Sequence, residues 1–321
     1  MDHKTRVYDN VFEMLPSEDN PTPLVRLNRL NTAPAFQLYA KLEWVNPFGS
    51  VKDRAAWAML RDLEERREVG GQRGIVEPTS GNTGISLAAM ARARGYHMRA
   101  VVPNKVPFEK KVLLKIAGAE LDVVSDELCP APGLGEGSIN LAKTYAKASR
   151  HKYAMPNQYE NEKNVEAHFR TTGPEIWKQT AGRITHLFLS LGTCGTVTGA
   201  SRFLRGKKPG VKVIAVQPTE GHDVPGLRNV SQLAVSKLFD RSLVDDILEV
   251  DFRLAYTRAL DLCQNEGLLA GPSSGLILEG ALQIVARDKE GVGVMIFPDS
   301  IFKYTSSMVK HIPALAAGTS A

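Results

Sequence analysis

Cysteine is scarce in this sequence, and long apolar runs are absent. The three cysteines, Cys129, Cys194 and Cys263, include no CxxC pair. This odd number of dispersed cysteines argues against a disulfide framework and a zinc site, so we expect small buried side chains and no bound metal. No segment reaches the roughly 18 consecutive apolar residues of a membrane span, and no apolar segment follows the first residues. We therefore expect a cytoplasmic protein without membrane contact.

Runs of charge of one sign are also missing. The chain of 321 residues has 40 Lys and Arg against 35 Asp and Glu, a net charge of +5. Acidic and basic residues are interspersed, as in segment 64–67, so we expect a solvated surface and no nucleic-acid partner. The small positive excess would also suit anionic substrates. The composition, 43% apolar and 23% charged, is that of a globular protein, and the length predicts about two domains.

Strand-like and helix-like segments alternate along most of the chain. This pattern predicts an α/β protein whose mostly parallel, twisted sheets carry helices on both faces. The predicted strands are 36–43, 74–79, 98–103, 121–124, 185–191, 211–216 and 292–297. The predicted helices are 51–68, 82–93, 108–117, 139–148, 197–204, 254–266 and 276–286. The pattern indicates two α/β units with a cleft between them, and the Pro- and Gly-rich segment 126–137 is expected to be a surface loop.

A lysine stands at the start of the predicted helix 51–68. The segment 46–54 reads Asn-Pro-Phe-Gly-Ser-Val-Lys-Asp-Arg, in which Ser50 would cap the helix and Lys52 would lie in its first turn. The positive end of the helix dipole lowers the pKa of a lysine placed there, and a Schiff-base lysine needs such a lowered pKa. Taken alone, the segment is better explained by a solvated surface lysine.

Three further polar loops stand at the start of a predicted helix, and the first two of them directly follow a predicted strand. They are Thr-Ser-Gly-Asn-Thr-Gly at 79–84, Gly-Thr-Cys-Gly-Thr at 192–196 and Gly-Pro-Ser-Ser-Gly at 271–275. Backbone N–H and hydroxyl groups at such positions suit a carboxylate or a phosphate, although each loop alone is also explained as an ordinary helix cap. Dinucleotide binding is not expected, because no acid is well placed for a ribose near Gln217. All four loops, at the carboxyl ends of strands, would meet at one crevice.

Together these motifs resemble the cysteine synthase and cystathionine β-synthase family. The resemblance runs from Thr22 to about Tyr304 and rests on Asn-Pro-x-Gly-Ser-Val-Lys-Asp-Arg, Thr-Ser-Gly-Asn-Thr-Gly and Gly-Thr-x-Gly-Thr in the family's order and spacing. It implies a pyridoxal 5′-phosphate enzyme of fold type II, similar to the tryptophan synthase β chain, with two three-layer domains. Residues 1–43 and 154–321 would form the large cofactor-phosphate domain, and 44–153 the smaller, mobile substrate-binding domain. It also implies a homodimer.

The resemblance also assigns roles to individual residues. Lys52 would form the Schiff base with the cofactor and later move the Cα proton of the substrate. Asn82 would bind the phenolic oxygen of the cofactor, and Ser273 would face its pyridine nitrogen. The residues expected at the cofactor phosphate are Gly192, Thr193, Cys194, Gly195 and Thr196. Those expected at the substrate carboxylate are Thr79, Ser80, Asn82, Thr83 and Gln158.

The reaction that these roles imply is β-replacement. A hydroxyl at the pyridine nitrogen stabilises a protonated ring less than a carboxylate does, which favours rapid loss of a β substituent over transamination. An activated serine, either O-phosphoserine or O-acetylserine, would give α-aminoacrylate, to which a sulfur donor adds to form L-cysteine.

The sequence departs from the family pattern at two places. Cys194 stands where the phosphate loop more often has Gly or Thr, which is tolerable if its side chain points away from the phosphate. Segment 222–230 lacks the His-Lys-Ile-Gln-Gly of typical O-acetylserine enzymes. Its Leu-Arg-Asn at 227–229, with Lys303-Tyr304, resembles the O-phosphoserine-dependent branch, where the sulfur donor can be a thiocarboxylate carrier protein. Arg228 would bind the substrate phosphate or, alternatively, form a surface or interdomain salt bridge.

Three other functions stay open. Cystathionine β-synthase and other synthases of β-substituted alanines, such as a diaminopropionate precursor, would share the first half-reaction. A non-catalytic regulatory protein of the same fold is the third, although intact Lys52 and an intact carboxylate loop argue against it.

Overall fold

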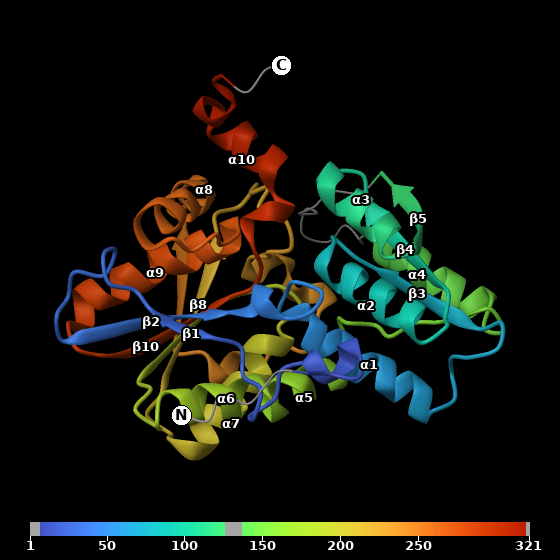
Figure 1. The fold of residues 1–321 in the computed structure, drawn as a ribbon, viewed down its shortest axis with the longest axis horizontal. Helices are drawn as coiled ribbons and strands as arrows, with labels where there is room; N and C mark the ends of the chain where they lie inside the picture. Colours follow the sequence, from blue (N-terminus) through green and yellow to red (C-terminus); the bar gives the residue numbers. More distant parts are fainter. Residues whose placement is uncertain (1–6, 126–136, 319–321) are drawn as a thin grey trace.

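Two α/β units make up the part of the chain that the computed structural model describes, residues 7–125 and 137–318 (Figure 1). The larger unit has a six-stranded sheet in the order β1-β2-β10-β7-β8-β9, and the smaller a four-stranded sheet in the order β5-β4-β3-β6. The predicted α/β class with mostly parallel sheets is confirmed. The predicted loop at 126–137, with Cys129, lies outside the described residues except for Gly137, which begins helix α4. The domain limits 44–153 stay a prediction.

The larger sheet is buried between two helical layers. Its strands are β1 (Leu24–Arg26), β2 (Phe36–Leu42), β7 (His186–Ser190), β8 (Lys212–Pro218), β9 (Asp246–Val250) and β10 (Gly291–Phe297). Only β1 is antiparallel to its neighbour. One face packs against α6 (Thr172–Gln179) and α7 (Gly195–Lys207), with α5 (Lys163–Arg170) beside them; the other packs against α8 (Phe252–Asp261) and α9 (Pro272–Asp288). Apolar residues on both faces follow from this double cover.

The smaller sheet is wholly parallel and also lies between two helical layers. Its strands are β3 (Gly74–Pro78), β4 (Met98–Pro103), β5 (Ala119–Val124) and β6 (Tyr153–Ala154). Helices α1 (Lys52–Glu65), α2 (Asn82–Ala93) and α3 (Phe108–Ile116) share one face, and α4 (Gly137–Ala148) covers the other.

Shorter elements complete the structure. They are α10 (Thr305–His311), the 3₁₀ helices Val11–Met14, Glu43–Val45, Val230–Val235, Arg241–Leu243, Ile301–Lys303 and Pro313–Ala316, and a π-helical turn Leu262–Glu266. This turn ends the segment that was predicted as one helix, 254–266. The elements that sequence patterns did not predict, β1, β6, β9, α5, α6 and α10, have at most eight residues each, too few for a clear period. No helix of the described residues is long and apolar enough to cross a membrane.

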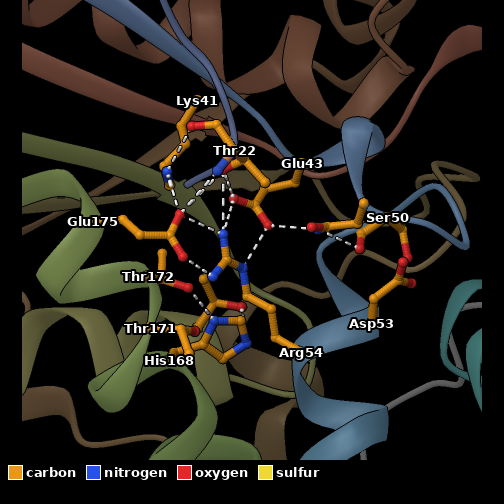
Figure 2. A network of polar contacts seen from close by, with 12 residues as sticks. Thr22, Lys41, Glu43, Ser50, Asp53, Arg54, His168, Thr171, Thr172 and Glu175 are labelled. Atoms are coloured by element: carbon orange, nitrogen blue, oxygen red, sulfur yellow. Dashed lines mark hydrogen bonds and ion pairs between the residues drawn. The ribbon is translucent and has the colours of Figure 1, made fainter. Parts of the chain in front are cut away.

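A buried ion network fixes the start of α1 to the larger unit (Figure 2). The Arg54 guanidinium contacts the carboxylates of Glu43, at 2.8 Å, and of Glu175, and the Lys41 ammonium lies 2.7 Å from Glu175. The hydroxyl of Thr22 donates to Glu43. Burial alone would raise the pKa of Glu43, but the charge and hydrogen bonds of Arg54 outweigh it and hold this pKa at about 2. Two cations thus balance two carboxylates, as a buried network requires.

We expect Arg54→Met to lower the free energy of unfolding by about 3 kcal/mol or more, because it leaves Glu43 and Glu175 buried with Lys41 as their only cation. The measurement is equilibrium urea denaturation. Arg61→Met is the matched control on the same helix, since Arg61 is half-exposed and its ion pairs with Glu64 and Glu65 are worth at most about 1 kcal/mol. Equal losses in the two variants would contradict the network's role.

Candidate active site

A pocket between the two units brings most of the predicted site residues together. The predicted residues that line it are Lys52, Thr79, Ser80, Asn82, Thr83, Gln158, Gly192, Thr193, Thr196, Arg228 and Ser273. Only Cys194 and Gly195 are missing from the lining. The expectation that all four loops follow strands is wrong for 271–275. This loop follows the π-helical turn; next to it, Ala270 forms an isolated bridge with Ser300, and the Gly271 N–H donates to the Asp299 carbonyl.

Lys52 is the first residue of α1 and reaches the pocket from its N-terminal end. Ser50 does not occupy the cap position, which Val51 takes, but its hydroxyl accepts a hydrogen bond from the Lys52 N–H. Burial lowers the pKa of Lys52, against the negative charge of Asp299. Within the described residues the Lys52 side chain makes no hydrogen bond or ion pair. An amine with a lowered pKa and no competing partner is suited to nucleophilic attack on a carbonyl.

The loop 79–84 begins α2 and is braced from within. The Thr79 hydroxyl accepts hydrogen bonds from the N–H groups of Gly81 and Gly84, both at 3.0 Å. Thr83 donates to the side-chain oxygen of Gln158 at 2.6 Å. The loop therefore presents the start of a twelve-residue helix to the pocket in a fixed shape, an arrangement that suits an anion such as a carboxylate.

The amide of Asn82 is held in one orientation by two charged residues. Its NH₂ group donates to Asp299 at 2.7 Å, and its oxygen accepts from the Lys303 ammonium at 3.3 Å. Because a carboxylate only accepts and an ammonium only donates, the two ends of the amide cannot exchange. Asn82 itself lines the pocket. Asp299 was not predicted as a site residue.

The loop 192–196 leads into α7 through a left-handed residue, Cys194, at φ 68°. The Cys194 side chain packs in a buried apolar cluster and does not line the pocket. Burial raises the pKa of this thiol to about 12, which makes it a poor nucleophile. Gly195 lies against Asn164, whose Oδ1 would be 2.0 Å from a Cβ at this position. The loop thus offers backbone N–H groups and the hydroxyls of Thr193 and Thr196, which suit a phosphate.

Arg228 and Ser273 complete the lining. The Arg228 guanidinium lies over the Tyr159 ring, 5.3 Å from its centroid, and its backbone N–H donates to the Leu191 carbonyl. Ser273 lies in the first turn of α9 and is buried. No lining residue of the described chain is acidic, whereas Lys52, Lys110 and Arg228 are basic.

Glu77 is a further buried acid that sequence reasoning missed. It lies in β3, and its carboxylate accepts the N–H groups of Asn157 and Gln158, both at 2.9 Å. It thereby holds the turn that places Gln158 against Thr83. An acidic residue inside the otherwise apolar strand Gly-Ile-Val-Glu-Pro was the only signal in the sequence.

Residues 16–299 match the family described as pyridoxal-phosphate dependent enzyme. The chain belongs to this family. Cysteine synthase B of Escherichia coli (strain K12) is 40% identical over 288 residues, which cover 90% of this chain and 93% of that protein. Cysteine synthase of Aquifex aeolicus (strain VF5) is 35% identical over 294 residues, covering 89% and 88%. The predicted resemblance to cysteine synthases of fold type II is therefore confirmed.

Solved structures agree with this placement. The cysteine synthase of Entamoeba histolytica superimposes with a TM-score of 0.84 at 28% identity, covering 99% of this chain and 97% of that one. O-ureido-L-serine synthase gives a TM-score of 0.84 at 31% identity, covering 95% and 96%.

The pocket fits pyridoxal 5′-phosphate, the cofactor of this family. It offers the Lys52 amine, which has no hydrogen-bond partner among the described residues, for the carbonyl carbon. At the start of α7 it offers a phosphate cradle where Gly195 leaves no room for a side chain. Among the described residues, no three His, Cys, Asp or Glu side chains lie close enough together to hold a metal ion.

We expect Glu77→Gln to change the pH dependence of stability. Burial raises the pKa of Glu77 from 4.5 to about 7 despite its backbone hydrogen bonds, so the fold favours the protonated acid. The stabilising contribution of this group is therefore fully present below pH 4.5 and is lost as the pH rises through 7. Relative to the glutamine variant, the wild type should lose about 3 kcal/mol of unfolding free energy over this range.

Urea denaturation of both proteins at about pH 5 and about pH 8 measures this difference. All other titrating groups are common to the two proteins, so their effects cancel in the comparison. A gap between wild type and variant that stays constant with pH would contradict the assignment.

Proposed function

We propose that the protein catalyses β-replacement on an activated serine and forms L-cysteine when a sulfur nucleophile adds. The observation that carries this proposal is the single pocket in which Lys52 faces two helix starts, the loop 79–84 and the loop 192–196. One helix start suits the carboxylate of an amino acid, and the other suits the phosphate of the cofactor. The cysteine synthases at 40% and 35% identity support the same reaction.

Pyridoxal 5′-phosphate, when bound, supplies a ring that takes up the electron pair left at Cα of an amino acid. We assign its phosphate to the backbone of Gly192, Cys194 and Gly195 and to the hydroxyls of Thr193 and Thr196. Asn82 would donate a side-chain N–H to the ring oxygen, and Ser273 would face the ring nitrogen. Lys52 would hold the cofactor and then accept the Cα proton at Nζ, since burial keeps its pKa low.

The substrate carboxylate is assigned to the N–H groups and hydroxyls of Thr79, Ser80, Asn82 and Thr83 and to the amide of Gln158. The cations of the pocket, unopposed by any acid in the described lining, favour an anionic β substituent or nucleophile. Arg228 can offer two parallel N–H groups to a phosphate, a geometry that a lysine lacks. We therefore propose O-phosphoserine as the preferred substrate over O-acetylserine, with a thiocarboxylate carrier protein as a possible sulfur source for this branch.

We further propose that the protein works as a homodimer in the cytoplasm. The smaller unit, residues 44–153, would move toward the larger one when the loop 79–83 binds the substrate carboxylate. Such closure would exclude water from the reacting atoms.

A second candidate is the synthesis of another β-substituted alanine, including the cystathionine β-synthase reaction and diaminopropionate-type products. The similarity to O-ureido-L-serine synthase supports this second candidate, because that enzyme is named for a β-substituted alanine. A non-catalytic regulatory role is disfavoured, because Lys52 and the carboxylate loop are both present and share one pocket.

We expect the visible absorption of the cofactor-loaded protein to change on titration with O-phosphoserine and with O-acetylserine, at a lower concentration for O-phosphoserine. Arg228→Ala should raise the half-saturating concentration of O-phosphoserine by about tenfold or more and leave that of O-acetylserine within about twofold, because one charged hydrogen bond contributes roughly that much. Lys52→Ala is the control in which both responses should disappear.

A stronger response to O-acetylserine, unaffected by Arg228→Ala, would reduce Arg228 to a structural residue. No change with either amino acid would contradict β-replacement and favour the regulatory role. Incubation with sulfide, thiosulfate, homocysteine or glutamate, followed by product analysis, then identifies the nucleophile.

A further inference from the structure

Lys110 is a second lysine in the pocket wall, and the proposed reaction does not use it. It lies in the first turn of α3 and is only 1% exposed. Its ammonium donates to the Tyr304 hydroxyl at 2.9 Å and lies 4.1 Å from the centroid of that ring. Because α3 belongs to the smaller unit and Tyr304 follows β10 of the larger one, this contact joins the two units at the pocket (Figure 1).

The aliphatic part of Lys110 packs on the loop 79–84. A Cβ on Gly81 would lie only 2.5 Å from Cδ of Lys110, and Gly81 has φ 137°, a conformation that L residues rarely adopt. The lysine stem therefore passes directly over the loop backbone. Displacement of Lys110 would therefore remove the packing contact that restrains Gly81.

Tyr304, the partner of Lys110, is also linked to the loop 79–84. The Tyr304 hydroxyl donates to Asp299 at 2.6 Å, and Asp299 accepts from Asn82 at 2.7 Å. Gly81 and Asn82 are adjacent residues, so the four side chains Lys110, Tyr304, Asp299 and Asn82 close a ring of contacts around the loop. The loop is held from one side by packing and from the other by a hydrogen bond.

A second contact between the same two elements supports this arrangement. The Glu109 carboxylate accepts hydrogen bonds from the Thr305 hydroxyl and from the N–H and hydroxyl of Ser306, at 2.6 to 2.8 Å. The start of α3 is thus fixed to the start of α10 at two successive residues. Of Glu109 and Lys110, Lys110 is the buried residue and the one that contacts the loop 79–84.

The charges around Lys110 explain why its ammonium needs this partner. Burial lowers its pKa to about 8; Asp299 and Glu109 oppose this effect, whereas Lys303 and Lys52 reinforce it. A buried ammonium facing two other lysines is retained at a cost in stability unless it is well hydrogen-bonded. The Tyr304 hydroxyl, held by Asp299, is the acceptor that meets this need.

We propose that Lys110 is a positioning residue, which bonds Tyr304 while its stem packs on Gly81 and so holds the loop 79–83 in the shape that receives the substrate carboxylate. This inference rests on the proposed function for the nature of the ligand, but the restraint on the loop can be tested without any substrate. Lys110→Met keeps most of the stem and removes the ammonium. Tyr304→Phe keeps the ring and removes the hydroxyl.

The first test is hydrogen exchange of the cofactor-loaded protein, followed by mass spectrometry of peptides that cover 79–84. Both variants should exchange about tenfold faster in these peptides. Lys110→Met loses the hydrogen bond to Tyr304, and Tyr304→Phe loses that bond and the one to Asp299, so the double variant should be no faster than Tyr304→Phe alone. Lys111→Met is the matched control, because its ammonium bonds the Asn104 carbonyl outside the ring. Unchanged exchange at 79–84, or an equal rise across both sheets, would overturn the proposal.

The second test links the restraint to the substrate. In the same two variants the half-saturating concentration of O-acetylserine in the absorption titration and its KM should rise by about tenfold, with kcat within about twofold, because loop order is required for binding and not for proton transfer by Lys52. Faster loop exchange without a rise in half-saturation would overturn the role in carboxylate binding. Absence of any spectral response in the wild type would instead contradict the proposed function and leave the exchange result standing.

Discussion

The pairing of Arg54 with two buried carboxylates is the interaction on which the rest of the site depends. Glu43 follows β2 of the larger sheet, Glu175 belongs to α6, and Arg54 lies in the first turn of α1. The chain passes from the larger unit to the smaller one through these residues, so the network fixes the crossing point. Lys52 lies two residues before Arg54. The Arg54 guanidinium cannot separate from Glu43 and Glu175 without leaving buried charges unpaired. Its ion pairs therefore also fix the position of Lys52 relative to the two helix starts.

The pocket lining and the structure behind it differ in the charge of their side chains. The described lining carries cations and no acid, whereas two acidic residues, Asp299 and Glu77, lie behind the lining and hold lining residues in position. Asp299 orients Asn82 and Tyr304, and Glu77 orients the turn with Gln158. This separation leaves positive charge facing the ligands, as expected for a site that binds a phosphate and a carboxylate together.

Local motifs predicted the loops of the site, but not the residues that hold those loops in place. Small and polar residues at a predicted helix start indicated Lys52, the loop 79–84 and the loop 192–196. The partners of these loops lie far away in the chain. Asn82 meets Asp299 across 217 residues, and Arg54 meets Glu175 across 121, so no periodicity relates them. The alternation of strands and helices was also predicted from sequence patterns. The three-residue strand β1 and the turn before α9 were not, because they depend on tertiary contacts.

The central claim is that Lys52, among several lysines at or near the pocket, holds the cofactor. The most direct measurement is to reduce the cofactor-loaded protein with borohydride, which fixes the cofactor on its lysine as a stable secondary amine, and to map the modified peptide by mass spectrometry. Lys52 should carry the whole of the added mass. Modification of Lys110 or Lys303 instead, or of no lysine at all, would contradict the account.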